Sequence, residues 1–167
     1  MKAIIYSQYG KADVLKLAEV EPPVLKPNTV VVKNYASSVN PIDWKIRSGL
    51  LRPLSGIKPP IRCGSDFAGE IVQLGLGASR FKVGDRVYGF VSPIKGGAYA
   101  QQLCVPEKQL AMMPELLNYA DAGVIPLAGL TAYTVLKKIA ALKPNDRIVI
   151  NGCSGGVGVM AIQLAKV

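Results

Sequence analysis

The segment IVINGCSGGVGVMAIQLAKV, residues 148–167, decides how the rest of the chain is interpreted. A short apolar run leads into a cluster of glycines, and the glycines lead into residues with helical character. A loop that binds a pyrophosphate needs backbone N–H groups at the start of a helix and glycines that let the phosphates approach. The segment therefore predicts a strand at 147–151, a phosphate-binding loop and a helix at 159–167.

The glycine loop differs from the usual G-x-G-x-x-G pattern, because Cys153 stands at its first position. The acidic residue that such domains carry about twenty positions later falls beyond Val167. A tight strand-to-helix turn without a ligand is the alternative interpretation. The residues predicted to bind a cofactor here are Ser154, Gly155, Gly156, Val157 and Gly158.

The rest of the chain changes character near residue 115. Before it, short segments rich in Val, Ile and Tyr predict strands at 2–6, 30–36, 69–75, 86–91 and 98–105, as in a small barrel or sandwich. After it, helical spacing predicts a helix whose face carries Leu127, Leu130, Thr131, Thr134, Val135 and Ile139. We expect a β-rich domain at 1–120, and a connecting helix with the start of a nucleotide-binding domain at 121–167.

Composition narrows the class of protein. Half of the 167 residues are hydrophobic and 19% are charged, which excludes a disordered chain. The net charge of +9 favours anionic partners, but the Lys and Arg residues are scattered, so we expect neither a nucleic acid nor a membrane as partner. The longest apolar stretch, 122–136, is interrupted by Pro126 and is too short to span a bilayer.

Histidine is absent, and the three cysteines are dispersed without a C-x-x-C pair. Histidine is the commonest zinc ligand and the commonest acid or base at neutral pH. An odd, dispersed set of cysteines argues against both a disulfide framework and a structural zinc site. We therefore predict a reducing, cytoplasmic location and no bound metal.

Six segments, in order along the whole chain, together resemble the medium-chain dehydrogenase/reductase superfamily. They are SSVNPIDWKIRSGL (37–50), CGSDFAGEIVQLG (63–75), FKVGDRVYG (81–89), GGAYAQ (96–101), AGLTAY (128–133) and the GGVG loop (155–158). More narrowly, they look like its zinc-free quinone oxidoreductase branch, which includes zeta-crystallin. This resemblance implies a mainly β fold: a GroES-like, partly open β-barrel, followed by the first β-α unit of a Rossmann domain. It also implies that the chain is the N-terminal part of a longer enzyme.

The resemblance bears on zinc as well. Zinc-dependent relatives place Cys where Asn40 stands, and a His-Glu pair where Ser65 and Asp66 stand. Asn and Ser are poor zinc ligands, so the catalytic metal is not expected. The cysteine-rich lobe of those relatives falls near residues 90–97, where this chain has only FVSPIKGG.

The activity implied is reduction of a quinone or an α,β-unsaturated carbonyl by hydride from NADPH, with NADH possible. The full-length enzyme is expected to be a homodimer, and the 167-residue chain alone is expected to be inactive. A family member with a scaffolding or interaction role is the alternative, and a nucleic-acid binder is a more remote one.

The resemblance also suggests site residues. Asn40 and Asp43 are the candidate catalytic residues, with Asn40 and Thr131 beside the nicotinamide. Structural roles stay open for each: Asn40 in an Asn-Pro turn, Asp43 as a helix cap and Thr131 as an ordinary helix residue. For Asp66 we favour a structural role, and for Tyr99 packing.

Overall fold

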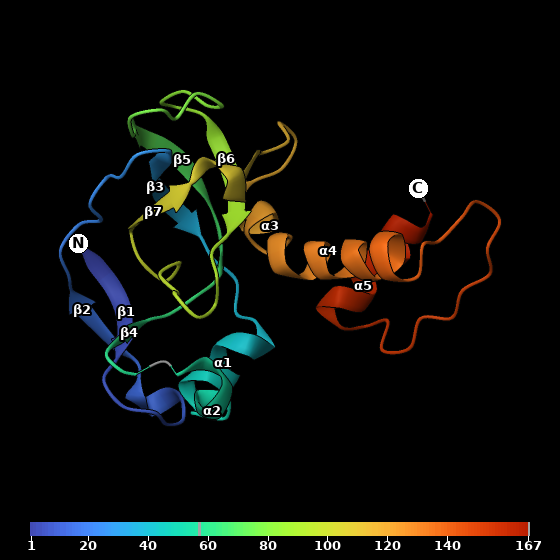
Figure 1. The fold of residues 1–167 in the computed structure, drawn as a ribbon, viewed down its shortest axis with the longest axis horizontal. Helices are drawn as coiled ribbons and strands as arrows, with labels where there is room; N and C mark the ends of the chain where they lie inside the picture. Colours follow the sequence, from blue (N-terminus) through green and yellow to red (C-terminus); the bar gives the residue numbers. More distant parts are fainter. Residues whose placement is uncertain (57, 167) are drawn as a thin grey trace. The chain divides into compact units, whose positions relative to one another are not determined.

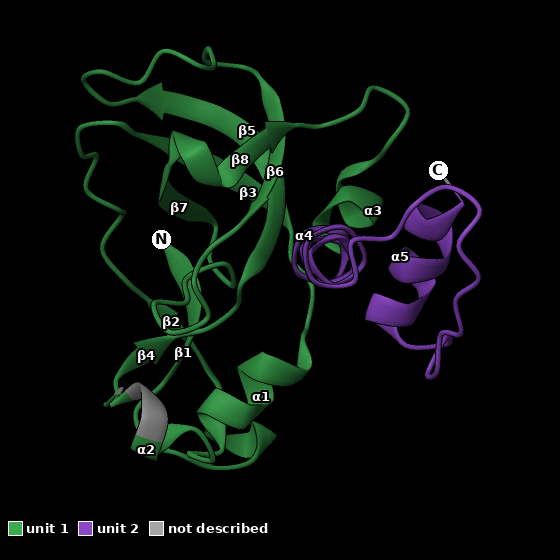
Figure 2. Ribbon diagram, turned by 45° about the vertical axis from the view of Figure 1, so that its right-hand side comes forward, with its two compact units in different colours: residues 1–124 green, residues 125–167 purple. Residues whose placement is uncertain are grey.

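The structure is a computed structural model that describes residues 1–56 and 58–166. The chain divides into two compact units, Met1–Val124 and Ile125–Val167, shown in different colours in Figure 2. Each unit is described by itself.

The first unit consists mainly of two antiparallel sheets (Figure 1). The smaller sheet has the order β2-β1-β4 and contains β1 (Lys2–Tyr6), β2 (Lys16–Glu19) and β4 (Ile61–Arg62). The larger sheet has the order β7-β3-β5-β6-β8 and contains β3 (Thr29–Ala36), β5 (Asp66–Leu74), β6 (Arg86–Phe90), β7 (Gln102–Pro106) and β8 (Leu110–Met112). The described strands thus form two open sheets rather than a closed barrel, which fits the predicted partly open, mainly β fold.

The larger sheet carries the main hydrophobic core. Apolar side chains on alternate positions of neighbouring strands point to the same face and pack together. Each fully buried aliphatic or aromatic side chain contributes about 1.5–3 kcal/mol relative to an exposed one. The buried residues of this cluster are Val30, Val32, Phe67, Ile71, Val87, Val91, Ala98, Leu103, Val105 and Leu110.

Short helices connect the strands of the first unit. They are η1 (Ala12–Val14), α1 (Pro41–Arg47), α2 (Arg52–Ser55), η2 (Glu107–Gln109) and α3 (Tyr119–Gly123). Helix α1 matters most for the site. It begins after Asn40, whose backbone is extended, with Pro41 in the first helical position, where no N–H is needed. The Asp43 carboxylate accepts a hydrogen bond from the Asn40 N–H at 2.8 Å, which fixes the start of the helix.

Most predicted strands are confirmed with shifted ends, but the first half of the one at 98–105 is wrong. Residues 98–101 pass between the two sheets instead of lying along one. Their backbone bonds β1 through Ile4 N–H to Tyr99 O at 2.8 Å, and β3 through Asn34 N–H to Gln101 O at 2.9 Å. Strands β2, β4 and β8 were not predicted, because segments of two to four residues carry too little periodicity.

The second unit contains α4 (Pro126–Tyr133), which continues as a π-helical segment, η3 (Thr134–Ile139), and α5 (Gly156–Ala165). The predicted helix is confirmed by α4 and η3, but most of the residues whose spacing predicted it lie outside the packed face. The residues that pack inside are Ala132 and Leu136, against Ala161 of α5, while Leu130 and Ile139 are exposed. Small alanines let two helices approach closely, which a search for large apolar residues does not detect.

The strand predicted at 147–151 does not form among the described residues. Ile148 and Val149 are exposed, and Val149 is 98% accessible. A strand is defined by hydrogen bonds to a neighbouring strand, and no described strand lies beside this segment. Helix α5 begins at Gly156, three residues before the predicted start. Within the described part of the chain, no helix has the length and apolar character needed to cross a membrane.

Candidate functional site

A network of hydrogen bonds surrounds the start of α1, with the Asp43 carboxylate at its centre. Asp43 Oδ1 accepts from the Ser65 hydroxyl at 2.8 Å. Asp43 Oδ2 accepts from the Asn40 N–H at 2.8 Å and from the Tyr99 hydroxyl at 3.1 Å. These donors come from the loop before α1, the entry to β5 and the segment between the two sheets. The carboxylate therefore ties three distant parts of the chain together.

A second carboxylate, Asp66, lies beneath Asn40 and is fully buried. Its Oδ2 accepts from the Ser38 hydroxyl at 2.7 Å and from Asn40 Nδ2 at 2.9 Å. Asn40 Nδ2 also donates to Ser38 Oγ at 3.0 Å. A buried carboxylate needs donors, so the amide nitrogen of Asn40 faces inward. The amide oxygen faces the Asp43 N–H, which is the second half of a capping box at the start of α1. An amide oxygen has two lone pairs, so it can accept one further hydrogen bond from a ligand.

Tyr99 completes the network from the other side. Its hydroxyl donates to Asp43 and to the Ser38 carbonyl, the latter at 3.0 Å. Burial, the charge of Asp43 and the hydrogen bond to it all raise the pKa of Tyr99, so the phenol keeps its proton at neutral pH. The Tyr99 ring lies against Gly64, whose φ is +90°, and any Cβ at Gly64 would overlap the ring. Glycine is required there for both reasons.

The structure thus brings together the two predicted catalytic residues, Asn40 and Asp43. Asp43 caps α1, and the donors around it suit a positioning role better than proton transfer. Sequence reasoning missed Ser38 as a partner of Asn40 and assigned Tyr99 to packing. Tyr99 is 56 positions from Asp43, and no local pattern links such distant residues.

The predicted glycine loop lies in the second unit, at the start of α5. Ser154, Gly155, Gly156 and Val157 are exposed, whereas Gly158 is buried. A Cβ at Gly158 would overlap the Gly152 carbonyl and the Cys153 backbone, so only glycine lets the helix pack on the loop. The first N–H groups of a helix have no partner within it and carry partial positive charge. With no Cβ at Gly155 or Gly156, these groups are open to an anion.

Thr131, predicted to lie near the nicotinamide, is exposed on α4. Its hydroxyl donates to the Leu127 carbonyl of the same helix at 2.7 Å. This is the usual local bond of a threonine inside a helix. The oxygen can still accept a hydrogen bond from a ligand, so its role stays a prediction.

Comparison with known proteins places the chain in a family. Residues 26–115 match the family described as "Alcohol dehydrogenase GroES-like domain". This range contains the whole network around Asn40 and no residue of the second unit. The chain belongs to this family.

Relatives of this GroES-like chain are oxidoreductases. It is 42% identical to "Quinone-oxidoreductase homolog, chloroplastic" of Spinacia oleracea, covering 99% of this chain and 52% of the relative. It is 38% identical to "NADPH-dependent alkenal/one oxidoreductase, chloroplastic" of Arabidopsis thaliana, covering 99% and 44%. The solved quinone oxidoreductase of Coxiella burnetii superposes with a TM-score of 0.90 at 37% identity, over 99% of this chain and 53% of that one.

The chain spans about half the length of these relatives. The predicted resemblance to quinone oxidoreductases is thereby confirmed for the N-terminal part. The prediction that the GroES-like domain holds no zinc stays a prediction. Among the described residues, no group of three or more His, Cys, Asp or Glu side chains is arranged to hold a metal ion.

Proposed function

We propose that this chain is part of an NADPH-dependent, zinc-free enzyme that reduces a quinone or an α,β-unsaturated carbonyl. The observation that carries the proposal is the fixed amide of Asn40: Asp66 and Ser38 hold its nitrogen, and its oxygen, at the start of α1, has a second lone pair for a ligand. The similarity to the Coxiella burnetii quinone oxidoreductase and to the Arabidopsis thaliana NADPH-dependent alkenal/one oxidoreductase supports the same class of substrate. NADH is the second possible cofactor.

The glycine loop fits the pyrophosphate of a dinucleotide. Gly155 and Gly156 leave the first N–H groups of α5 uncovered, and the ten-residue helix directs its positive end toward the loop. Ser154 would add a hydroxyl donor, and Gly156, Val157 and Gly158 would contribute backbone N–H groups. When bound, the nicotinamide supplies the hydride, and the protein supplies position and surroundings.

Asn40 would bind a donor group of the cofactor or substrate through its amide oxygen. It adds no charge, so a neutral ring or carbonyl can lie beside it without an electrostatic penalty. Its orientation is set by Asp66, and the loop that carries it is held by Asp43. We therefore assign Asn40 to ligand contact and Asp43 to positioning.

A quinone or enone suits this set of side chains. Addition of hydride to a conjugated acceptor spreads the negative charge onto an oxygen, where one hydrogen bond or a water molecule can stabilise it. The chain has no histidine to act as a strong acid near neutral pH. A simple ketone would need more polarisation than neutral donors provide.

A homodimer and a cytoplasmic location remain predictions of this proposal. Two of the relatives, from Spinacia oleracea and Arabidopsis thaliana, are chloroplastic, so the location of this protein needs its own measurement. A scaffolding role is the alternative function, and absence of turnover in the complete protein would favour it.

Asn40 variants of the complete protein test the proposal. Asn40→Ala should lower kcat/KM for a quinone on the order of a hundredfold, because a ligand misplaced by about 1 Å reacts that much more slowly. Asn40→Ala should also lower the free energy of unfolding by about 1–2 kcal/mol, because the buried Asp66 loses one donor, so kcat/KM is compared per folded molecule. Asn118→Ala serves as the matched control, because Asn118 caps α3 by accepting from the Asp121 N–H at 2.8 Å, with the same spacing of three residues, and shares no hydrogen bond with the network around Asn40. Unchanged kcat/KM in Asn40→Ala would remove the residue from the site.

A further inference from the structure

A recess of about 650 Å³ lies in the first unit, and no residue of the Asn40 network lines it. Its walls come from the segment before β3, from β7 and from the loop after β6. Sites for small organic ligands occupy about 300–1,000 Å³. The recess is therefore large enough for a ligand of its own.

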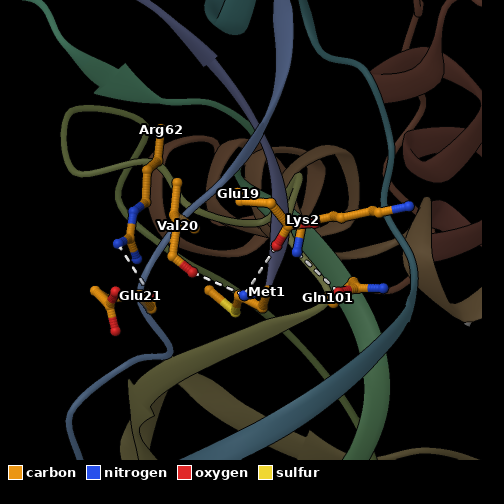
Figure 3. A network of polar contacts seen from close by, with 7 residues as sticks. All are labelled: Met1, Lys2, Glu19, Val20, Glu21, Arg62 and Gln101. Carbon is orange, nitrogen blue, oxygen red and sulfur yellow. Dashed lines mark hydrogen bonds and ion pairs between the residues drawn. The ribbon is translucent and has the colours of Figure 1, made fainter.

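The walls of this recess are held in place by hydrogen bonds within the protein. The Thr29 hydroxyl donates to the Lys26 carbonyl at 2.7 Å and accepts from the Lys26 N–H at 3.1 Å, which closes the turn before β3. The Arg62 guanidinium donates to the Glu21 carbonyl at 3.4 Å, as Figure 3 shows. The segment between Glu21 and Thr29 is thus attached at both ends, and its shape does not depend on a ligand.

The lining combines positive charge with apolar surface. Lys26, Arg62 and Lys95 contribute three cations, and Glu21 contributes the one carboxylate. Among the described residues, none of these cations forms an ion pair with a carboxylate. The apolar part of the lining includes Val24, Val91 and Leu103. Unpaired cations beside an apolar wall complement a molecule that is anionic at one end and apolar at the other.

We propose that this recess binds an amphipathic monoanion, a carboxylate carried on a short apolar chain. Its charged end would lie among Lys26, Arg62 and Lys95, and its apolar chain against Pro23, Val24 and Pro106, which line the same recess and lie outside the core. The proposal does not depend on the reductase activity, because it concerns residues of the first unit that lie outside the Asn40 network.

The three cysteines make occupancy measurable. Cys104 is half-buried and lines the recess, with its sulfur 3.1 Å from the Thr29 hydroxyl oxygen. Cys153 is exposed in the second unit, and Cys63 is buried. A ligand in the recess would shield Cys104 from an alkylating reagent while Cys153 reacts at its usual rate. Cys153 is therefore an internal control in the same molecule.

The experiment measures alkylation of the 167-residue chain by N-ethylmaleimide, followed cysteine by cysteine by mass spectrometry, with sodium octanoate as the probe. At ten times its Kd, octanoate should slow alkylation of Cys104 about tenfold, because the reactive free form is reduced by that factor. The rate at Cys153 should not change. Replacement of two cations, Lys26→Gln with Lys95→Gln, should raise the octanoate concentration needed for half-protection on the order of tenfold.

The matched control removes the same two charges elsewhere, by Lys11→Gln with Lys82→Gln, and should leave protection unchanged. The proposal would be overturned if millimolar octanoate left the alkylation rate of Cys104 unchanged, or slowed Cys153 equally. It would also be overturned if the neutral analogue 1-octanol protected Cys104 as well as octanoate does, or if the control pair of substitutions weakened protection as much as the pair in the recess.

Discussion

Asp43→Ala should destabilise the first unit strongly, because the Asp43 carboxylate accepts three hydrogen bonds from separate parts of the chain. Loss of the bond that caps α1 costs about 1 kcal/mol. The Ser65 hydroxyl is fully buried, and it loses its acceptor, whereas the Tyr99 hydroxyl keeps the Ser38 carbonyl as an acceptor. At about 1.5 kcal/mol for the Ser65 bond and about 0.5 kcal/mol for the Tyr99 bond, the expected loss is about 3 kcal/mol.

Urea unfolding measures this loss, with fluorescence of Trp44 as the signal. Trp44 is the one tryptophan of the sequence and lies on α1, so it reports directly on the affected unit. Asp85→Ala is the matched control, because Asp85 accepts one backbone bond from Lys82 with the same spacing of three residues. Asp85→Ala should lower the free energy of unfolding by about 1 kcal/mol. Equal losses in the two variants would refute the idea that Asp43 ties the network together.

Two further predictions concern the same unit. Gly64→Ala should lower the free energy of unfolding by about 3 kcal/mol or more, since it adds overlap with the Tyr99 ring to the strain of a positive φ. Gly84 has a similar φ with open space around it, so Gly84→Ala measures the strain alone and should lower stability less in the same urea assay. Burial raises the pKa of the Cys63 thiol to about 11, so the folded unit keeps a proton that the unfolded chain releases above pH 9. The free energy of unfolding should therefore fall as the pH rises from 9 to 11. Melting temperatures measured across this pH range should fall less steeply for Cys63→Ala, and an equally steep fall would show that other groups cause it.

The sequence was sufficient for the strands of the larger sheet, because buried residues such as Val30, Val32 and Ile71 form Val- and Ile-rich runs bounded by turns. It was sufficient for the cap at the start of α1, because Asn-Pro-Ile-Asp carries a local cap signature. The roles of Asn40 and Asp43 as site residues stay predictions. It could not connect Asp43 with Tyr99 or Asn40 with Asp66, because those bonds depend on how distant strands are paired.

In the second unit, local sequence patterns were not sufficient. Residues 147–151 have the composition of a buried strand, yet a strand also requires a partner, which local composition cannot supply. The packed face of α4 could not be predicted for a related reason. Helical spacing identifies a stripe of apolar residues, but the packed stripe is the one whose small side chains, Ala128 and Ala132, admit the neighbouring helix.

The most direct test of the proposed function is NADPH oxidation, followed by absorbance with a quinone and with an enone as acceptors. The complete protein and the 167-residue chain are compared at equal concentration. We predict turnover by the complete protein with at least one of these acceptors. We predict none by the 167-residue chain, where the segment after Arg147 has no strand beside it among the described residues. A complete, folded protein that binds NADPH but reduces neither class of acceptor would contradict the proposed function.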